Sequence, residues 1–213
     1  STFKKKEKLF NSNGNLINVV QPVYFDENLC ALDSKGILKC LNTSTNKFFF
    51  EVDTKHENIE KLEIIRGGIA YFDEKIVTVD AYGHIKLYDI NTQQIIWSNQ
   101  IEFSILSAPL IYRNLIYFVS SDNRVFAINL DTGDVEWSFQ TTFENKKNLT
   151  TPTPVAFENL IIVPFSNGEL IAFKYDDGQP VWSENVSKVS LISNFDIKDI
   201  AANPVVSGSD VFT

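Results

Sequence analysis

An eleven-residue segment recurs four times in this 213-residue chain, and it constrains the fold more than any other feature. The copies are Leu87–Trp97, Ala127–Trp137 and Ala172–Trp182, with a divergent copy at Cys40–Phe50. Each opens on a small or apolar residue, passes through a polar turn and closes on a large aromatic residue, a pattern that predicts two strands joined by a tight turn. The closing aromatics lie 47, 40 and 45 positions apart, which is the blade period of a β-propeller.

The repeat also extends towards the N-terminus of each copy. Turn residues stand four positions before every opening residue: Gly36, Gly83, Asn123 and Gly168. Fourteen positions before those stand Pro22, Ile69, Pro109 and Pro154, and a fifth unit opens at Pro204. The prediction is an all-β chain forming one β-propeller of four-stranded antiparallel blades over residues 1–213. Repeats start near residues 22, 69, 109, 154 and 204, and the segment 1–21 contributes an orphan outer strand near Phe10.

The closing aromatics Phe50, Trp97, Trp137 and Trp182 are expected in the core between blades. Adjacent blades of a propeller must bury one face against each other. A tryptophan can bury roughly 200 Å² there and still donate its N–H to a carbonyl.

Two cysteines occupy apolar slots of the repeat. Cys30 is aligned with Val77 and Tyr117, and Cys40 with the small or apolar opening residues. This alignment favours two buried small hydrophobes. A cross-strand disulfide is the alternative, if the register places the two residues opposite each other.

Composition and spacing provide no sign of catalysis. The net charge of −8 disfavours nucleic acid, whose phosphates must be neutralised by the protein. The carboxylate pairs Asp26-Glu27 and Asp73-Glu74 fall in turns, and neither His56 nor His84 has a metal-ligand companion at useful spacing. We therefore predict no catalytic, cofactor or metal site.

The connections between repeats vary in length while the strands stay constant. From each closing aromatic to the next repeat start there are 12 positions after Trp97, 17 after Trp137 and 22 after Trp182. These connections share one rim of a propeller, and insertions gathered on one face usually mark the binding face of a repeat protein.

The motif A-x-[ND]-x-x-T-G-x-x-x-W resembles the tryptophan-docking motif of pyrroloquinoline-quinone-type propellers. Within that superfamily, Asp199–Val206 and Trp137–Pro154 resemble the corresponding parts of the BamB family. The resemblance implies a non-enzymatic eight-bladed propeller on the periplasmic side of the outer membrane. It also implies an N-terminal lipid anchor outside this chain and attachment to the periplasmic domains of BamA, the central barrel-inserting protein.

The resemblance further implies that the connections after Trp137 and Trp182 dock this partner, over residues 145–151 and 193–203. The candidate partner-binding residues are Lys146, Lys147, Asn148, Leu149 and Asp199. Leu149 matches the family's leucine, but its arginine has no counterpart. Asp199 matches the first of two family aspartates, and Ala201 replaces the second.

Two other function classes are weighed against docking. Some members of the superfamily are quinoprotein dehydrogenases, and the resemblance to them implies a calcium ion, a catalytic aspartate and two adjacent cysteines. This chain has no adjacent cysteines. The third class is a propeller that binds a small ligand in its central channel, for which the sequence supplies no ligand-specific cluster.

Eight blades of roughly 44 residues need on the order of 350 residues. We therefore expect the chain to be a fragment of a longer propeller. Its open blade edges would favour association of two copies.

Overall fold

The structure is a computed structural model, and it describes residues 20–33, 36–55, 67–142, 152–186, 203–207 and 210–212. Every regular element in these ranges is a β-strand. Among the described residues, no helix has the length and apolarity needed to cross a membrane. The orphan strand expected near Phe10 lies outside the described residues.

The strands form four sheets of four antiparallel strands and one of two. Blade 1 holds β1 (Val23–Phe25), β2 (Asn28–Leu32), β3 (Ile37–Asn42) and β4 (Lys47–Asp53). Blade 2 holds β5 (Gly67–Phe72), β6 (Lys75–Asp80), β7 (His84–Asp89) and β8 (Ile95–Gln100). Blade 3 holds β9 (Leu110–Tyr112), β10 (Leu115–Val119), β11 (Arg124–Asn129) and β12 (Val135–Gln140). Blade 4 holds β13 (Val155–Phe157), β14 (Leu160–Pro164), β15 (Glu169–Lys174) and β16 (Pro180–Asn185), and β17 (Val205–Ser207) and β18 (Asp210–Phe212) form the last hairpin.

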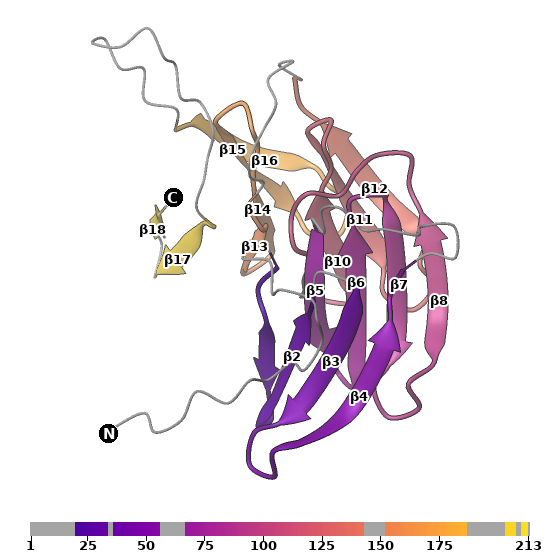
Figure 1. Cartoon of the computed structure of the whole chain (residues 1–213). Helices are drawn as coiled ribbons and strands as arrows, with labels where there is room; N and C mark the ends of the chain where they lie inside the picture. The colour runs from indigo at the N-terminus through magenta and orange to yellow at the C-terminus, as the bar shows by residue number, and fades with distance from the viewer. Residues whose placement is uncertain are drawn as a thin grey trace, which may run out of the picture.

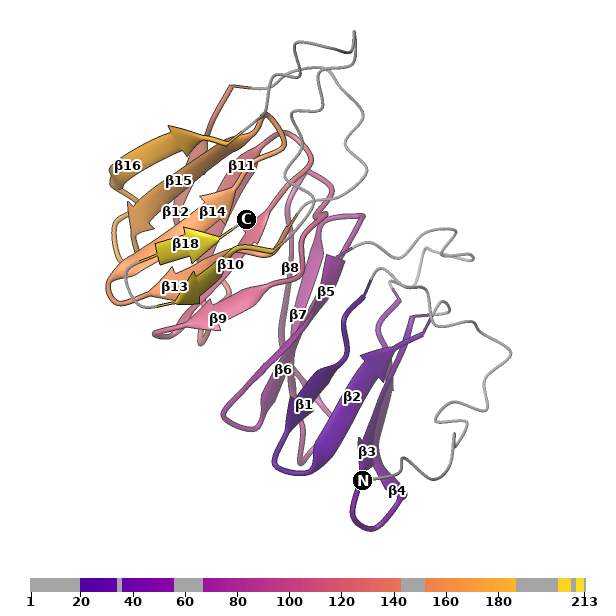
Figure 2. The same ribbon diagram turned by 90° about the vertical axis from the view of Figure 1, so that its left-hand side faces the viewer.

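The blades follow one another around an arc, face to face (Figures 1 and 2). The first strands β1, β5, β9, β13 and β17 are successive neighbours along the inner side of this arc. Strand order within each blade follows the chain, so the fourth strand of each blade lies on the outer side. This arrangement confirms the predicted fold class of four-stranded propeller blades.

Each closing aromatic lies directly opposite its opening residue across the third and fourth strands. The pairs are Cys40 with Phe50, Leu87 with Trp97, Ala127 with Trp137 and Ala172 with Trp182. In all four blades the register shifts immediately after the opening residue, which leaves one extra residue before the aromatic. A β-bulge of this kind re-aims the side chain that follows it. Here it is the aromatic that reaches the next blade.

Two tryptophans dock on the turn of the following blade, as the sequence predicts. The Trp97 indole N–H donates to the carbonyl of Leu130 at 2.8 Å, and that of Trp137 donates to the carbonyl of Tyr175 at 3.0 Å. The rings lie against glycines: a Cβ built on Gly133 would stand 2.9 Å from the Trp97 ring, and one on Gly178 2.5 Å from the Trp137 ring. Both glycines also have a positive φ, the conformation that the predicted tight turn requires.

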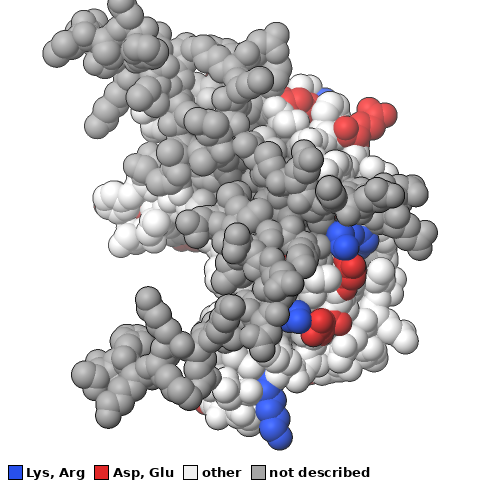
Figure 3. Space-filling model, in the orientation of Figure 1, with Lys and Arg blue, Asp and Glu red and all other residues white. Residues whose placement is uncertain are grey.

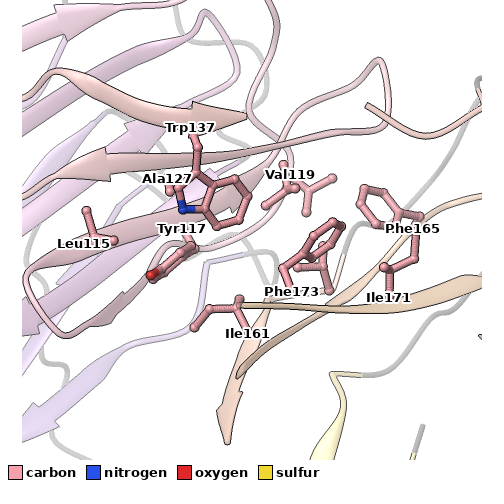
Figure 4. Close-up of a cluster of buried hydrophobic side chains, with 11 residues drawn as sticks. Leu115, Tyr117, Val119, Ala127, Trp137, Ile161, Phe165, Ile171 and Phe173 are labelled. Carbon is pink, nitrogen blue, oxygen red and sulfur yellow. The ribbon is translucent and has the colours of Figure 1, made fainter. Parts of the chain in front are cut away.

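The interface between blades 3 and 4 shows how these contacts build the core. Figure 4 shows Trp137 and Tyr117 of blade 3 on the side that faces Phe173 of blade 4. The Trp137 and Phe173 ring centroids are 5.8 Å apart, and the Tyr117 hydroxyl donates to the carbonyl of Tyr175 at 2.8 Å. Trp182 of blade 4 and Val206 and Val211 of the last hairpin pack against one buried cluster, which consists of Ile162, Leu170 and Ala172.

The interface between blades 1 and 2 departs from this pattern. Phe50 is buried and makes an edge contact with Tyr88 at 6.3 Å between ring centroids. Cys30 and Cys40 are paired directly opposite each other and form a disulfide. Their predicted burial is confirmed. Of the two alternatives, the structure shows the cross-strand disulfide, because the adjacent strands place the two residues opposite each other.

Candidate partner-docking rim

The connections between blades share one end of the sheets with the turns between second and third strands, since all strands within a blade are antiparallel. We call this end the connection rim. Lys146, Lys147, Asn148, Leu149 and Asp199, the residues predicted to bind a partner, lie outside the described residues. The structure does describe the bases of both connections that contain them, where each connection leaves one blade or enters the next.

Asn123 holds the start of the first connection. It lies in the turn before β11 and is 2% exposed. Its side-chain NH₂ donates to the carbonyl of Thr142 at 3.4 Å, and its side-chain oxygen accepts from the hydroxyl of Ser166 at 2.6 Å and from the Ser166 N–H at 3.3 Å. One side chain thus joins blade 3, blade 4 and the point where the chain leaves blade 3.

Blade 4 supplies a second anchor at the same place. The Asn167 NH₂ lies 2.7 Å from the Glu169 carboxylate, 3.4 Å from the Thr142 carbonyl and 3.3 Å from the Thr142 hydroxyl. The Thr141 hydroxyl donates to the same Glu169 carboxylate. Thr141 and Thr142 are therefore held by side chains of the next blade, so the connection starts from a well-defined position.

The two predicted docking connections meet where they end. The Thr153 N–H, just after the first connection, donates to the side-chain oxygen of Asn203 at 2.8 Å. Asn203 is the last residue of the second predicted segment. This bond links residues fifty positions apart in the chain. It places Thr153, two residues after the first segment, beside Asn203 at the end of the second segment.

Lys86 holds a third connection, which starts after blade 1. This lysine is 7% exposed, and its ammonium donates to the carbonyls of Thr54 at 2.9 Å and Lys55 at 3.1 Å. Nearby, Nδ1 of His84 lies 3.0 Å from the Asp80 carboxylate. Sequence reasoning missed these contacts. The only available signal was a lysine in a repeat slot that holds Phe126 and Ile171 in the later blades.

A hollow of about 300 Å³ opens on the inner side of the arc. It is lined by the inner-strand residues Pro22, Val23, Ile69, Ala70, Tyr71, Pro109, Leu110 and Ile111, together with Gln21, Ala108, Thr153 and Asn203. None of the described residues that line the hollow carries a charge. Across the described ranges, no three His, Cys, Asp or Glu side chains are grouped to hold a metal.

The charged side chains that are visible on one face of the described residues are of mixed sign (Figure 3). Figure 3 shows acidic and basic side chains of the described residues next to one another on this face. An example is Lys39, which lies 3.0 Å from the carboxylate of Glu51. A pair with one largely exposed partner, here Glu51, contributes little to stability.

Antiparallel four-stranded blades, docked through tryptophan and glycine around a common axis, define a protein of the β-propeller class. Solved propellers share this fold. BamB from Moraxella catarrhalis superposes with a TM-score of 0.79 at 18% identity, over 94% of this chain and 59% of that one. The quinohemoprotein alcohol dehydrogenase ADHIIG from Pseudomonas putida HK5 gives a TM-score of 0.64 at 14% identity, over 78% and 34%.

The sequence family described as outer membrane protein assembly factor BamB matches residues 33–213, and the chain belongs to that family. BamB of Yersinia pestis is 21% identical over 212 residues, covering 93% of this chain and 52% of the relative. BamB of Vibrio cholerae is 24% identical over 201 residues, covering 94% and 51%. The chain therefore spans about half the length of the curated relatives it matches.

Proposed function

We propose that this chain is a non-enzymatic scaffold in outer-membrane protein assembly, which docks the periplasmic domains of a BamA-like protein. The docking surface consists of residues 145–151 and 193–203 on the connection rim. The observation that carries this proposal is the bond from the Thr153 N–H to Asn203 at 2.8 Å. Because Thr153 follows the first segment by two residues and Asn203 ends the second, a partner can contact the two as one surface.

The anchoring of the first segment supports the same function. Asn123 and Asn167 fix Thr142 at the start of the connection through buried amide groups. A loop that starts and ends at fixed points on a rigid scaffold loses less conformational freedom on binding than a free segment. The short segment 145–151 offers two cations and one apolar side chain, a combination suited to a partner surface with acidic and apolar groups.

The family supports the location that we propose, and the cysteines are consistent with it. We place the chain on the periplasmic side of the outer membrane, held there by an N-terminal lipid anchor outside this chain. The disulfide between Cys30 and Cys40 suits this location, since disulfides form and persist in the periplasm and other oxidising compartments.

The test is binding to purified periplasmic domains of a BamA-like protein from the same organism, measured by biolayer interferometry at two salt concentrations. The first variant is Lys146→Glu/Lys147→Glu, and the second is Leu149→Ala/Asp199→Ala. We expect each to weaken binding at least tenfold while leaving the thermal midpoint unchanged. We also expect the effect of the lysine variant to shrink at high salt, because exposed charges are screened.

The matched control reverses the same number of charges at the opposite end of the blades. Lys47 and Lys75 begin β4 and β6 there, so Lys47→Glu/Lys75→Glu should leave binding intact. If the rim variants combined bind as tightly as the wild type, the docking surface lies elsewhere. If the wild type itself does not bind, the scaffold function is wrong.

A further inference from the structure

The first blade interface differs from the next two at three positions at once. Interfaces 2–3 and 3–4 each combine a tryptophan, an indole hydrogen bond and a glycine under the ring. At interface 1–2 the tryptophan slot holds Phe50, which has no N–H to donate. The glycine slot holds Gln93, with a φ of 60°. The positions on β2 and β3 next to the aromatic hold the Cys30–Cys40 disulfide.

These differences are linked by geometry. In the two later interfaces, the indole ring lies so close to a glycine that a Cβ on that glycine would stand within 3 Å of the ring. The real Cβ of Gln93 therefore leaves no room for a tryptophan at position 50. The Gln93 amide instead donates to the carbonyl of Phe49 at 3.0 Å. The smaller phenyl ring then packs beside the disulfide in one buried cluster with Leu38, Ile76 and Tyr88.

We propose that the Cys30–Cys40 disulfide takes the place of tryptophan docking at this interface, and that the hairpin β2–β3 is the substrate of a disulfide-bearing oxidant before blade 2 packs onto it. One cysteine thiolate attacks the oxidant's disulfide and forms a mixed disulfide. The other thiolate then displaces the oxidant. The chain gains its S–S bond, the oxidant's S–S bond is reduced, and the two protons lost by the chain's thiols end on the two thiols of the reduced oxidant.

Burial sets the order of these events. Both cysteines are 0% exposed, in a cluster that includes residues of blade 2. The oxidant must contact sulfur directly, and in the assembled interface it has no access. The pairing itself needs only the β2–β3 hairpin, where the two Cα atoms are 4.0 Å apart. Oxidation of the isolated hairpin is therefore the accessible route.

The first experiment compares thermal midpoints of the full chain. Cys30→Ala/Cys40→Ala should melt about 5–10 °C below the oxidised wild type, as expected for a cross-link that closes a short loop in a chain of this size. Adding Phe50→Trp and Gln93→Gly to that variant should recover most of the loss, because the interface then has the indole and the space it needs. Phe50→Trp alone should recover nothing, because Gln93 still blocks the ring.

A cysteine-free variant that melts at the wild-type midpoint would overturn the stabilising role. If the variant with all four substitutions does not regain stability, the claim that the disulfide takes the place of tryptophan docking is wrong. Because the variants can lose folding altogether, the wild type supplies an independent measurement. Reduced chain is refolded with glutathione disulfide present from the start, or folded in reductant first and then exposed to the same oxidant.

Thiol alkylation and mass spectrometry follow the appearance of the S–S bond in both arms. We expect oxidation to be several-fold slower when the chain has already folded, because the interface covers both sulfurs. Equal rates in the two arms would contradict the proposed order. Neither experiment uses a docking partner, so both outcomes are independent of the function proposed above.

Discussion

Trp137 illustrates how a single residue joins two blades. Its ring lies against Gly178, and its N–H reaches the carbonyl of Tyr175 in the same turn. The ring also contacts Phe173 across the interface. Burial of the aromatic surface and satisfaction of its one polar atom therefore both depend on the next blade's turn.

We expect Trp137→Ala to lower the free energy of unfolding by about 3–5 kcal/mol, as large truncations in protein cores do. Asp134→Ala, in the exposed turn of the same hairpin, should change it by less than about 0.5 kcal/mol. Urea melts followed by fluorescence of the remaining tryptophans measure both. Equal midpoints for the two variants would contradict the docking role of Trp137.

Ionisation of Tyr88 makes the free energy of unfolding depend on pH in the alkaline range. Burial, the largest cause, raises the pKa of Tyr88 from 10.0 to about 12, so the folded state favours the neutral phenol. This contribution is complete below pH 10 and is lost as the pH rises towards 12. Burial also raises the pKa of Tyr117, which acts in the same direction.

We therefore expect the free energy of unfolding to fall between pH 10 and 12, and Tyr88→Phe to make that fall shallower. For one group the difference is at most about 2–3 kcal/mol. Urea melts at several pH values between 9 and 12 measure it. A Tyr88→Phe curve parallel to the wild type would show that Tyr88 ionises equally in both states.

At the scale of the element, the turn before β11 must meet two requirements: a residue with positive φ and a side chain that anchors the connection. Its equivalents in the other blades are Gly36, Gly83 and Gly168, all with positive φ. Asn123 also has a positive φ, of 57°, which asparagine tolerates better than most residues. Unlike glycine, it has an amide that reaches both Thr142 and Ser166. The turn therefore closes the hairpin and anchors the connection.

Asn123→Gly separates the two requirements, because it keeps the backbone conformation and removes the amide. We expect a loss of about 1–2 kcal/mol in stability and weaker binding to the BamA-like domains. Asn123→Ala should cost more stability, since alanine disfavours positive φ. Chemical melts and binding assays on the two variants test this, and a glycine variant identical to wild type in both assays would exclude an anchoring role.

At the scale of the whole molecule, the last hairpin has two unlike faces. Val206 and Val211 pack against a buried cluster of blade 4, as Trp182 does, whereas Val205 and Phe212 on the other face are each 59% exposed. In the other blades, the equivalent faces are buried against a neighbour. An apolar blade face of this kind favours association.

We accordingly predict that these 213 residues self-associate through the exposed apolar face of Val205 and Phe212, and that Val205→Lys/Phe212→Lys shifts them towards monomer. Tyr82→Lys is the control, because Tyr82 is also exposed, at 44%, but lies in the turn between β6 and β7 of blade 2, which has a blade on each side (Figure 1). Light scattering over a range of concentrations gives the mass. A wild-type chain that stays monomeric throughout would contradict the prediction.

The sequence by itself determined the local structure of this protein. The spacing of Trp97, Trp137 and Trp182 predicts the blades, and Gly133 and Gly178 predict the tight turns, because period and turn chemistry act over a few neighbouring residues. The fold class and the family could be predicted from the sequence for the same reason. The five predicted docking residues depend on resemblance alone and lie outside the described residues.

Only the tertiary structure decided which distant groups meet. The alignment of Cys30 with Cys40 depends on strand register, and the bond from Thr153 to Asn203 depends on two connections ending at the same place. In the sequence, Lys86 is an ordinary strand residue. Only the fold brings its ammonium to the carbonyls of Thr54 and Lys55 at the end of blade 1. Such contacts depend on how blades are oriented in space, and a pattern read along one strand carries no information about that.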